Sequence, residues 1–219
     1  MQELKNPIEK LSYYISRKIR EKKFKHFLLE LKPKNDDMIV DVGVNNEEYS
    51  ESDNYLEKHY LFPENITAVS KDDTSLFEKR YPHIKSVLAD GRRLPFPDNN
   101  FDISYSNAVI EHVGDKSDQI SFLKELLRVS ARGYFTTPNR LFPIEVHTRV
   151  PLLHLILSKK YFDSFLVLIG KKWATGNYMH LLSKKELLAI IKDAGITNYT
   201  ISSNFLFGLP ITFSVIWKK

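Results

Sequence analysis

Apolar residues recur at helical spacing along the first part of the chain. They are Ile8, Leu11, Ile15, Ile19, Phe24, Phe27, Leu28 and Leu31. This spacing places them on one face of an α-helix, and lysine and arginine occupy much of the remainder. Asn6 and Pro7 supply a cap residue and a proline at the first helical position, while Pro33 ends the run. The pattern predicts one long basic amphipathic helix over residues 1–33.

After residue 33 the apolar pattern changes to short β-rich runs that alternate with helical segments. The runs cover residues 38–42, 66–69, 84–89, 101–105 and 133–137, and the helical patterns cover 54–60, 74–80 and 118–129. Such alternation indicates a parallel sheet, because a parallel strand can be reached only through a crossover connection. Residues 38–140 are therefore predicted to form a doubly wound core with helices on both faces of the sheet.

Residues 141–180 interrupt this alternation and are predicted to form a helical insertion after the fifth strand. Two apolar segments, residues 151–157 and 161–170, are separated by Lys159 and Lys160. Neither segment reaches the length of about 20 apolar residues that a membrane-spanning helix needs. Three alternatives could cover their apolar side chains: packing within the domain, a homodimer contact, or peripheral contact with a membrane.

The last part of the chain, residues 183–219, is predicted to hold one helix and two strands. Ser183 and Glu186 have the spacing of a capping box, and Gly195 is the residue type that commonly follows a helix end. Runs over residues 196–203 and 211–217 flank a turn at 207–210, as in an antiparallel pair at a sheet edge. The predicted fold class is α/β: one doubly wound, Rossmann-like domain over residues 1–219, with a mainly parallel seven-stranded sheet and an antiparallel last strand.

Composition narrows the class of protein further. The 219 residues include 42% hydrophobic residues, enough for a core, and a net charge of +5, too mild for a dedicated nucleic-acid binder. The absence of cysteine excludes disulfides and thiolate zinc sites. The first residues show no apolar segment of a secretory signal, so we expect a cytoplasmic location.

Candidate chemistry lies at the strand ends, because ligands of doubly wound sheets bind outside the carboxyl ends of the strands. The first strand is followed by Asp41, Gly43 and Val44, in which an acid precedes a glycine that allows close backbone approach. By itself this D-x-G pattern is equally consistent with an ordinary strand-to-loop turn.

The segment after the third strand is far more specific. Residues 87–102 read V-L-A-D-G-R-R-L-P-F-P-D-N-N-F-D, followed by I-S-Y-S-N-A-V-I-E-H-V, and later by E-L-L-R-V at 125–129 and G-Y-F-T-T-P-N at 133–139. These segments resemble the class I S-adenosylmethionine-dependent methyltransferases, in particular their type 11 domain, over roughly residues 40 to 139. The resemblance implies a Rossmann-like fold, S-adenosylmethionine as cofactor and methyl transfer as the activity.

The resemblance also implies roles for single residues. Asp41 and Gly43, with the backbone after Gly43 that includes Val44, match positions near the methionine end of the cofactor. Asp90 matches the acid that accepts from the adenine amine, although a turn-capping acid is the alternative. Gly91 and Arg92 would flank the adenine, and Asn107 would contact the cofactor from the fourth strand.

Two positions depart from the family pattern. Only Gly43 remains of the glycine-rich G-x-G-x-G loop. Ser70 stands where the family has the acid that holds the ribose hydroxyls, and serine cannot make that charged bidentate contact. Asp72 or Asp73 could replace the missing acid, or either could cap a helix.

The acceptor would lie beyond the fifth strand, near residues 137–148. His147 is the candidate general base and Glu145 the group that orients it, with loop ordering as the alternative for both. Glu111 and His112 are similar to part of the E-x-x-E-H metal site of some quinone O-methyltransferases, but Ala108 replaces the first acid, so we predict no metal.

Taken together, these residues predict O-methylation of a small molecule or a glycan, with the insertion closing over the acceptor. The alternative is a methyltransferase-fold binding module without catalysis, which the altered glycine loop and Ser70 would favour. Nucleic-acid methylation is disfavoured, because residues 104–107 read S-Y-S-N where base methyltransferases have a [D/N]-P-P-aromatic turn.

Overall fold

The computed structural model describes residues 7–176 and 179–219, so the predicted cap Asn6 lies outside the described residues. The strands are β1 (Ile39–Val42), β2 (Ile66–Ser70), β3 (Lys85–Leu88), β4 (Phe101–Asn107), β5 (Ser130–Pro138), β6 (Tyr199–Leu206) and β7 (Leu209–Lys218). The α-helices are α1 (Pro7–Leu31), α2 (Tyr55–His59), α3 (Ser75–Arg80), α4 (Lys116–Val129), α5 (Leu153–Ile156), α6 (Lys159–Leu168) and α7 (Lys184–Asp193). Within the described residues there are also three 3₁₀-helices: η1 (Pro63–Asn65), η2 (Ile110–His112) and η3 (Lys172–Ala174).

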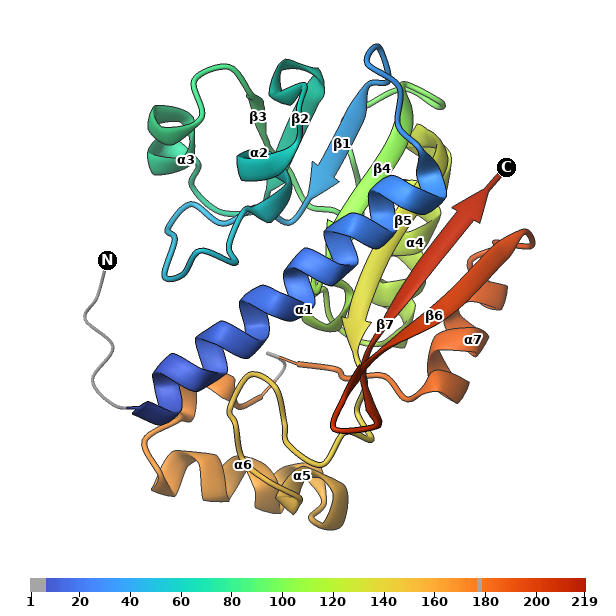
Figure 1. Ribbon diagram of the computed structural model, residues 1–219. Helices are drawn as coiled ribbons and strands as arrows, with labels where there is room; N and C mark the ends of the chain where they lie inside the picture. Colours follow the sequence, from blue (N-terminus) through green and yellow to red (C-terminus); the bar gives the residue numbers. More distant parts are fainter. Residues whose placement is uncertain (1–6, 177–178) are drawn as a thin grey trace.

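The seven strands form one sheet in the order β3-β2-β1-β4-β5-β7-β6. All neighbouring pairs from β3 to β5 are parallel, whereas β7 lies antiparallel between β5 and β6 (Figure 1). The chain runs from β1 outward to β3 and then returns to β4 beside β1, so the strand order reverses between β1 and β4. The predicted fold class is therefore confirmed, including the antiparallel last strand.

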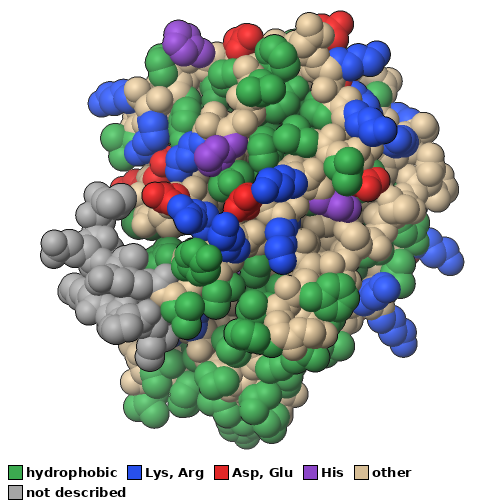
Figure 2. Space-filling model, in the orientation of Figure 1, with side chains coloured by type: hydrophobic (Ala, Val, Ile, Leu, Met, Phe, Trp, Pro, Cys, Tyr) green, Lys and Arg blue, Asp and Glu red, His purple; other side chains and the backbone are tan. Residues whose placement is uncertain are grey.

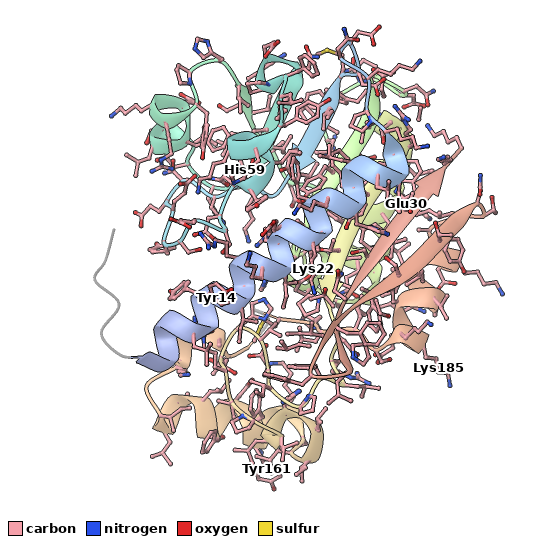
Figure 3. The ribbon with its side chains drawn as sticks, viewed as in Figure 1. Tyr14, Lys22, Glu30, His59, Tyr161 and Lys185 are labelled. Atoms are coloured by element: carbon pink, nitrogen blue, oxygen red, sulfur yellow. The ribbon has the colours of Figure 1, made fainter. Side chains whose placement is uncertain are left out.

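Hydrophobic clusters lie on both faces of the sheet. One face packs against α4 and α7, whose buried residues include Phe122, Leu126 and Leu187. The other face packs against α1, where Phe27 is fully buried with its ring edge against Tyr105 and Tyr134. Helix α1 thus crosses the sheet as part of the core (Figure 3). Burial of Phe27 explains why the apolar stripe continues to the end of this helix.

Most differences from the predicted elements lie at their boundaries. Helix α4 begins two residues earlier than predicted, because Asp115 caps it and forms a capping box with Asp118. The capping box of Ser183 and Glu186 is present as predicted. Strand β6 begins later than predicted, at Tyr199, since Gly195 ends α7 with φ +83° and the next residues turn before pairing. The strand then extends to Leu206 past a bulge at Asn204 and Phe205.

The insertion after β5 lies beyond the carboxyl ends of the parallel strands (Figure 1). Its first apolar segment forms only the single turn of α5, and its second forms α6. A small core of Val150, Phe162, Leu166 and Ala174 holds the insertion together. No helix within residues 7–176 or 179–219 is both long enough and apolar enough to cross a bilayer. The insertion therefore places two short helices opposite the edge where the candidate site residues emerge.

Candidate functional site

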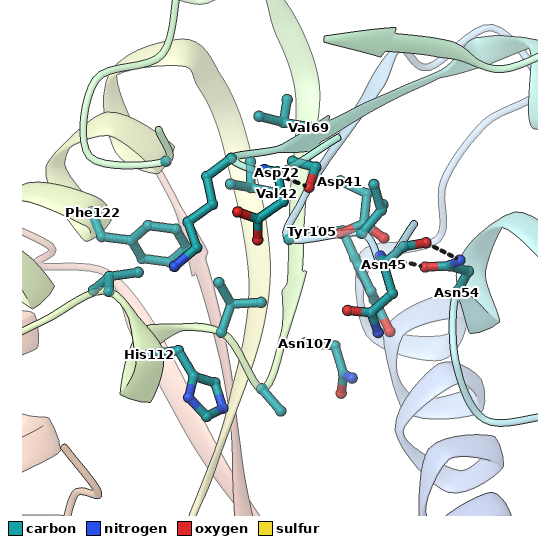
Figure 4. A pocket seen from close by; sticks show the side chains of 18 of the residues that line it. Asp41, Val42, Asn45, Asn54, Val69, Asp72, Tyr105, Asn107, His112 and Phe122 are labelled. Carbon is teal, nitrogen blue, oxygen red and sulfur yellow. Dashed lines mark hydrogen bonds between the residues drawn. The ribbon is translucent and has the colours of Figure 1, made fainter. Parts of the chain in front are cut away.

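A cavity of about 490 Å³ lies at the carboxyl ends of β1 to β4. It brings together all eight residues predicted to bind the cofactor: Asp41, Gly43, Val44, Ser70, Asp90, Gly91, Arg92 and Asn107. His147 also lines this cavity (Figure 4 shows part of the lining). The carboxyl ends meet here because the parallel strands share one direction, and the order reverses beside β1. The sequence prediction of a common site for these residues thus agrees with the geometry.

Gly43 occupies a position that accepts no side chain. Its φ is +111°, and a Cβ atom built on it would lie 2.2 Å from Cγ2 of Val109. Its amide and that of Val44 both donate to the carbonyl oxygen of Val69, at 2.8 and 3.2 Å. The loop that follows has no further glycine and is held instead by Asn54, which accepts from the Asn45 amide at 2.9 Å and donates to its carbonyl oxygen at 2.8 Å.

Asp41 lies at the floor of the cavity close to a second buried acid, Glu57 of α2. Burial raises the pKa of Asp41 well above its usual value, and the charge of Glu57 raises it further. Burial likewise raises the pKa of Glu57, to about 7. Two buried carboxyl groups that lie close to each other share a proton near neutral pH. A cation entering the cavity would favour loss of that proton.

Asp90 and Ser70 line the same cavity. The carboxylate of Asp90 accepts from Arg92, whose Nε lies 3.0 Å from both carboxylate oxygens. These hydrogen bonds lower the pKa of Asp90 despite its partial burial. Arg92 also donates to Asp118, at 2.8 Å, so Asp90 is held in place as an ionised acceptor. Ser70 accepts from the amide of Asp72 at 3.2 Å.

Asn107 at the end of β4 has a fixed orientation. Its Oδ1 accepts from Thr136 Oγ1 at 2.8 Å and from Lys23 Nζ at 3.4 Å. The ammonium form of lysine can only donate, so beside it the amide oxygen faces Lys23 and the Nδ2 group faces away from it. This Nδ2 atom is buried and has no hydrogen-bond partner among the described residues. Asn107 therefore offers an unused donor beside the cavity.

Lys23 reaches this point from α1 and is almost completely buried. Burial lowers the pKa of Lys23 to about 7, the charge of Arg20 lowers it too, and the charge of Glu111 opposes both effects. Its hydrogen bonds to Asn107 and Thr136 tie the first helix to the ends of β4 and β5.

His147 and Glu145 form a closely packed pair in the loop after β5. One carboxylate oxygen of Glu145 accepts from Nδ1 of His147 at 2.9 Å and from the His147 amide at 3.0 Å. Its other oxygen accepts from the amide and hydroxyl of Thr148. Burial would raise the pKa of Glu145, but the hydrogen bonds and charge of His147, together with the bonds from Thr148, lower it to about 2. Glu145 is therefore ionised, and it holds the proton of neutral His147 on Nδ1.

The other nitrogen of His147 faces His112 and Glu111. Its Nε2 lies 3.2 Å from Nε2 of His112 and 3.8 Å from Oε1 of Glu111. Burial lowers the pKa of His147, but the Glu145 hydrogen bond and the charges of Glu111 and Glu145 outweigh it, so the pKa of His147 is raised. Oε1 of Glu111 is buried with no hydrogen-bond partner among the described atoms. Nε2 of His147 is thus the basic atom presented at the edge of the cavity.

Glu111, His112 and His147 are also the described residues that could hold a metal ion, since one ligand atom from each lies within 4.8 Å of the others. The sequence pattern indicates Glu111 and His112 as candidate ligands but cannot place His147 beside them, because His112 and His147 are 35 residues apart. The prediction that the site uses no metal stays a prediction.

Four further residues of this region were not predicted from sequence. Arg20 and Tyr105 line the cavity, and Lys23 is buried next to it. Lys23 lies on the helical face that also carries Phe27. A lysine on an otherwise apolar stripe was therefore the sequence signal that could have indicated its burial. Glu57 had no such signal, because its burial follows from the docking of α2.

A second cavity, of about 630 Å³, lies between the insertion and α7 and reaches Glu145. Its apolar lining includes Leu155, Leu157 and Phe162, and its polar lining includes Arg140 and Glu186. The two latter side chains form an ion pair at 2.7 Å. Because Glu145 lines this cavity and His147 lines the first, the hydrogen-bonded pair stands between them.

Comparisons with known proteins agree with this arrangement. Residues 40–136 match the family model described as a methyltransferase domain. A probable S-adenosylmethionine-dependent methyltransferase of Mycobacterium tuberculosis is 32% identical over 78 residues, which are 35% of this chain and 28% of that protein. The chain therefore aligns with well under half the length of this curated relative.

Solved structures share the fold over nearly the whole chain. A possible histamine N-methyltransferase of Thermotoga maritima has a TM-score of 0.60 at 16% identity, covering 95% of this chain and 92% of that one. Geranyl diphosphate C-methyltransferase of Streptomyces coelicolor has a TM-score of 0.54 at 14% identity, covering 92% and 82%.

The sheet order, the site at the carboxyl strand ends and the similar structures define the class I S-adenosylmethionine-dependent methyltransferase fold. Within this fold class, residues 40–136 match the methyltransferase-domain family, and the curated relative similar to this chain is a probable S-adenosylmethionine-dependent methyltransferase. The resemblance stated from the sequence is thereby confirmed, and S-adenosylmethionine is the cofactor that this family uses.

Proposed function

We propose that this protein transfers a methyl group from S-adenosylmethionine to a hydroxyl oxygen of a small molecule or a glycan. One observation carries the proposal: His147 lines the same cavity as the predicted cofactor residues while Glu145 fixes its Nδ1. A nitrogen base held in this way suits an acceptor that must lose a proton, as an alcohol does.

The cavity residues fit S-adenosylmethionine by charge and by hydrogen-bonding type. Asp41, with Glu57 behind it, would hold the ammonium group, and the unpartnered amide of Asn107 would donate to the same end of the molecule. Asp90 would accept from the adenine amine with Gly91 and Arg92 beside the ring. Gly43 and Val44 would allow the cofactor to approach the backbone, and Ser70 would contact the ribose.

The chain's own residues then account for the proton. When bound, S-adenosylmethionine supplies a methyl group on a positively charged sulfur. In the proposed step, the acceptor hydroxyl replaces His112 at Nε2 of His147 and gives its proton to that nitrogen. With S-adenosylmethionine held by the cavity residues, the acceptor oxygen would take its methyl group and S-adenosylhomocysteine would remain. Glu145 stabilises the protonated imidazole, and the fixed positions of both reactants supply much of the rate.

The second cavity supports the choice of acceptor. It combines apolar walls such as Leu157 and Phe162 with polar groups such as Arg140, His180 and Glu186. Polyhydroxylated acceptors need both kinds of contact, because sugar rings have apolar faces and hydroxyl edges. One of the two solved structures named above is a possible histamine N-methyltransferase and the other is a geranyl diphosphate C-methyltransferase, so this chain's own cavity is the better guide.

The proposal can be tested by incubating the purified protein with S-adenosylmethionine labelled in the methyl group and a panel of acceptors. The panel contains free sugars, nucleotide sugars, phenols and amines. We expect the label to appear as an O-methyl ether on one hydroxyl compound. Exclusive labelling of amines or carbon atoms would contradict the proposal, and tight S-adenosylhomocysteine binding without any transfer would favour a binding module.

Asp90→Ala should weaken S-adenosylhomocysteine binding about 5- to 150-fold, because the adenine amine would lose a charged acceptor worth about 1–3 kcal/mol. Isothermal titration calorimetry measures the change. Asp98→Ala is the control, since Asp98 is an exposed acid that pairs with Arg128 away from the cavity. Equal affinities of the Asp90 variant and the original protein would remove Asp90 from the adenine site.

Cofactor affinity should fall as the pH is lowered from about 8 to 5.5. The raised pKa values of Asp41 and Glu57 mean that the acid pair takes up a proton in this range, which removes negative charge facing the ammonium group. Glu57→Gln should flatten the dependence. Calorimetric titrations with S-adenosylhomocysteine at four pH values would measure it, and a rise in affinity at low pH would refute this role.

Removing divalent ions should leave both binding and transfer unchanged to within about twofold. His147 acts as a base in the proposed reaction, and a nitrogen bound to a metal could not take the proton. The measurement compares protein dialysed against EDTA with untreated protein. Loss of transfer that a divalent ion restores would make Glu111, His112 and His147 a metal centre.

A further inference from the structure

The insertion exposes an apolar surface at one end of the molecule. We call it the apolar tip and define it by Leu152, Leu155, Ile156, Tyr161, Val167, Leu168 and Ile169, each at least 40% exposed. Figure 2 shows hydrophobic side chains gathered over this end, and Figure 3 places Tyr161 there. Exposed apolar patches of this extent on a soluble protein commonly mark contact sites.

The tip is not needed for the insertion's own core. Helix α6 buries Phe162 and Leu166 against Val150 and Ala174 on one side. On the outer side, Tyr161 is 66% exposed and Leu168 is 83% exposed. A helix that is apolar on both sides needs a partner for the outer one.

The charges around the tip are positive. Residues 141–182 contain five lysines and arginines but only two acids, Glu145 and Asp163. Glu145 is buried against His147, and Asp163 pairs with Lys159 at 3.1 Å. Lys159 and Lys160 begin α6, and Lys171 and Lys172 follow its end, so cations bracket the apolar face. Apolar side chains framed by lysines match an interface that is apolar inside and anionic at its surface.

The tip is continuous with the acceptor side of the site. Leu155 and Lys159 line the second cavity, which extends to Glu145. A molecule whose apolar part lies in a membrane could therefore reach the His147 and Glu145 pair without leaving it. A contact with a second protein copy would cover the same entrance.

We propose that the apolar tip docks on an anionic membrane surface, and that the acceptor is a lipid-linked hydroxyl compound drawn from that membrane. The first claim, the docking half of the proposal, stands by itself. The second claim, the acceptor half, rests on the proposed function. Binding would be peripheral and reversible, since short apolar helices with flanking lysines enter only the headgroup region.

Co-sedimentation with vesicles tests the docking half. The probes are phosphatidylcholine vesicles with and without 30% phosphatidylglycerol at about 0.1 M salt. We expect binding only to the anionic vesicles, and about tenfold weaker binding at 0.5 M salt. Ile156→Asp with Leu168→Asp, and separately Lys160→Glu with Lys172→Glu, should each weaken binding at least about tenfold.

Matched controls lie elsewhere on the surface. Leu29→Asp with Leu61→Asp changes side chains that are 66% and 84% exposed, and Lys79→Glu with Lys124→Glu reverses two exposed lysines. Both controls should bind as the original protein does. Circular dichroism and thermal melting establish that every variant is folded. If the control lysine pair weakens binding as much as Lys160→Glu with Lys172→Glu, the attraction comes from net charge and the docking proposal is wrong.

Two other outcomes would overturn the docking proposal. One is the absence of binding to anionic vesicles by the folded protein. The other is a dimer of the original protein in sedimentation velocity runs, with the Ile156→Asp and Leu168→Asp variant monomeric. That result would assign the tip to contact with a second copy. Methyl transfer to a water-soluble acceptor with no gain from vesicles would overturn only the acceptor half, while failure of all transfer would count against the proposed function.

Discussion

His147→Gln is expected to lower kcat/KM for methyl transfer by about 10²- to 10⁴-fold, the usual contribution of a positioned general base. Glutamine keeps a polar side chain of similar reach but cannot accept a proton. Binding of S-adenosylhomocysteine should change by less than about twofold, since the cofactor is assigned to other residues. The measurements are a transfer assay with the acceptor found in the panel and calorimetry with S-adenosylhomocysteine.

The pH profile distinguishes a base from a residue that merely orders its loop. His147 must be neutral to take a proton, and its pKa is raised above the ordinary value for histidine. Transfer by the original protein should therefore increase with pH up to that raised pKa and then level off. His147→Gln should lose this dependence, and the exposed His83→Gln should retain it. A variant as active as the original, or one with the same pH profile, would leave the loop-ordering alternative.

Gly43→Ala is expected to weaken S-adenosylhomocysteine binding about a hundredfold and to lower the melting temperature. The new Cβ would lie 2.2 Å from Val109, and alanine at φ +111° is strained by about 1–3 kcal/mol. Calorimetry and thermal melting measure the two effects.

Two controls separate strain from crowding at this position. Gly195→Ala also places alanine at a positive φ, but a Cβ there would meet nothing within 4 Å, so only its strain should appear. Val109→Ala combined with Gly43→Ala removes the contacting methyl groups and should recover part of the stability. Full cofactor affinity in Gly43→Ala alone would show that the cofactor does not approach this loop.

The sheet could be predicted from sequence because its signals are local. The runs at 66–69 and 101–105 are apolar and short, and the structure places β2 and β4 over them. The N-terminal stripe of apolar residues that ends at Leu31 was likewise sufficient to predict helix α1. Strand order and the position of β7 between β5 and β6 depend on contacts distant in sequence, and no local pattern reports them.

The site was predictable only in part, because some of its contacts join residues that are far apart in sequence. Asp41, Asp90 and Asn107 follow strands that the pattern located, so their convergence could be foreseen. The hydrogen bond of Lys23 to Thr136 joins residues 113 positions apart, and no sequence spacing reports such a contact. The raised pKa of Asp41 also depends on Glu57, which helix docking brings close.

The residues assigned to the cofactor and those assigned to the acceptor lie in different segments of the chain. Every residue assigned to the cofactor lies within the matched segment 40–136, whereas the proposed base His147 and its partner Glu145 lie outside it. Selection on the cofactor residues and on the acceptor residues can therefore proceed separately, one in the shared strands and the other in the insertion. Two proteins with nearly the same strands could then methylate different compounds, and inheritance of substrate preference should be traced through the loop after β5.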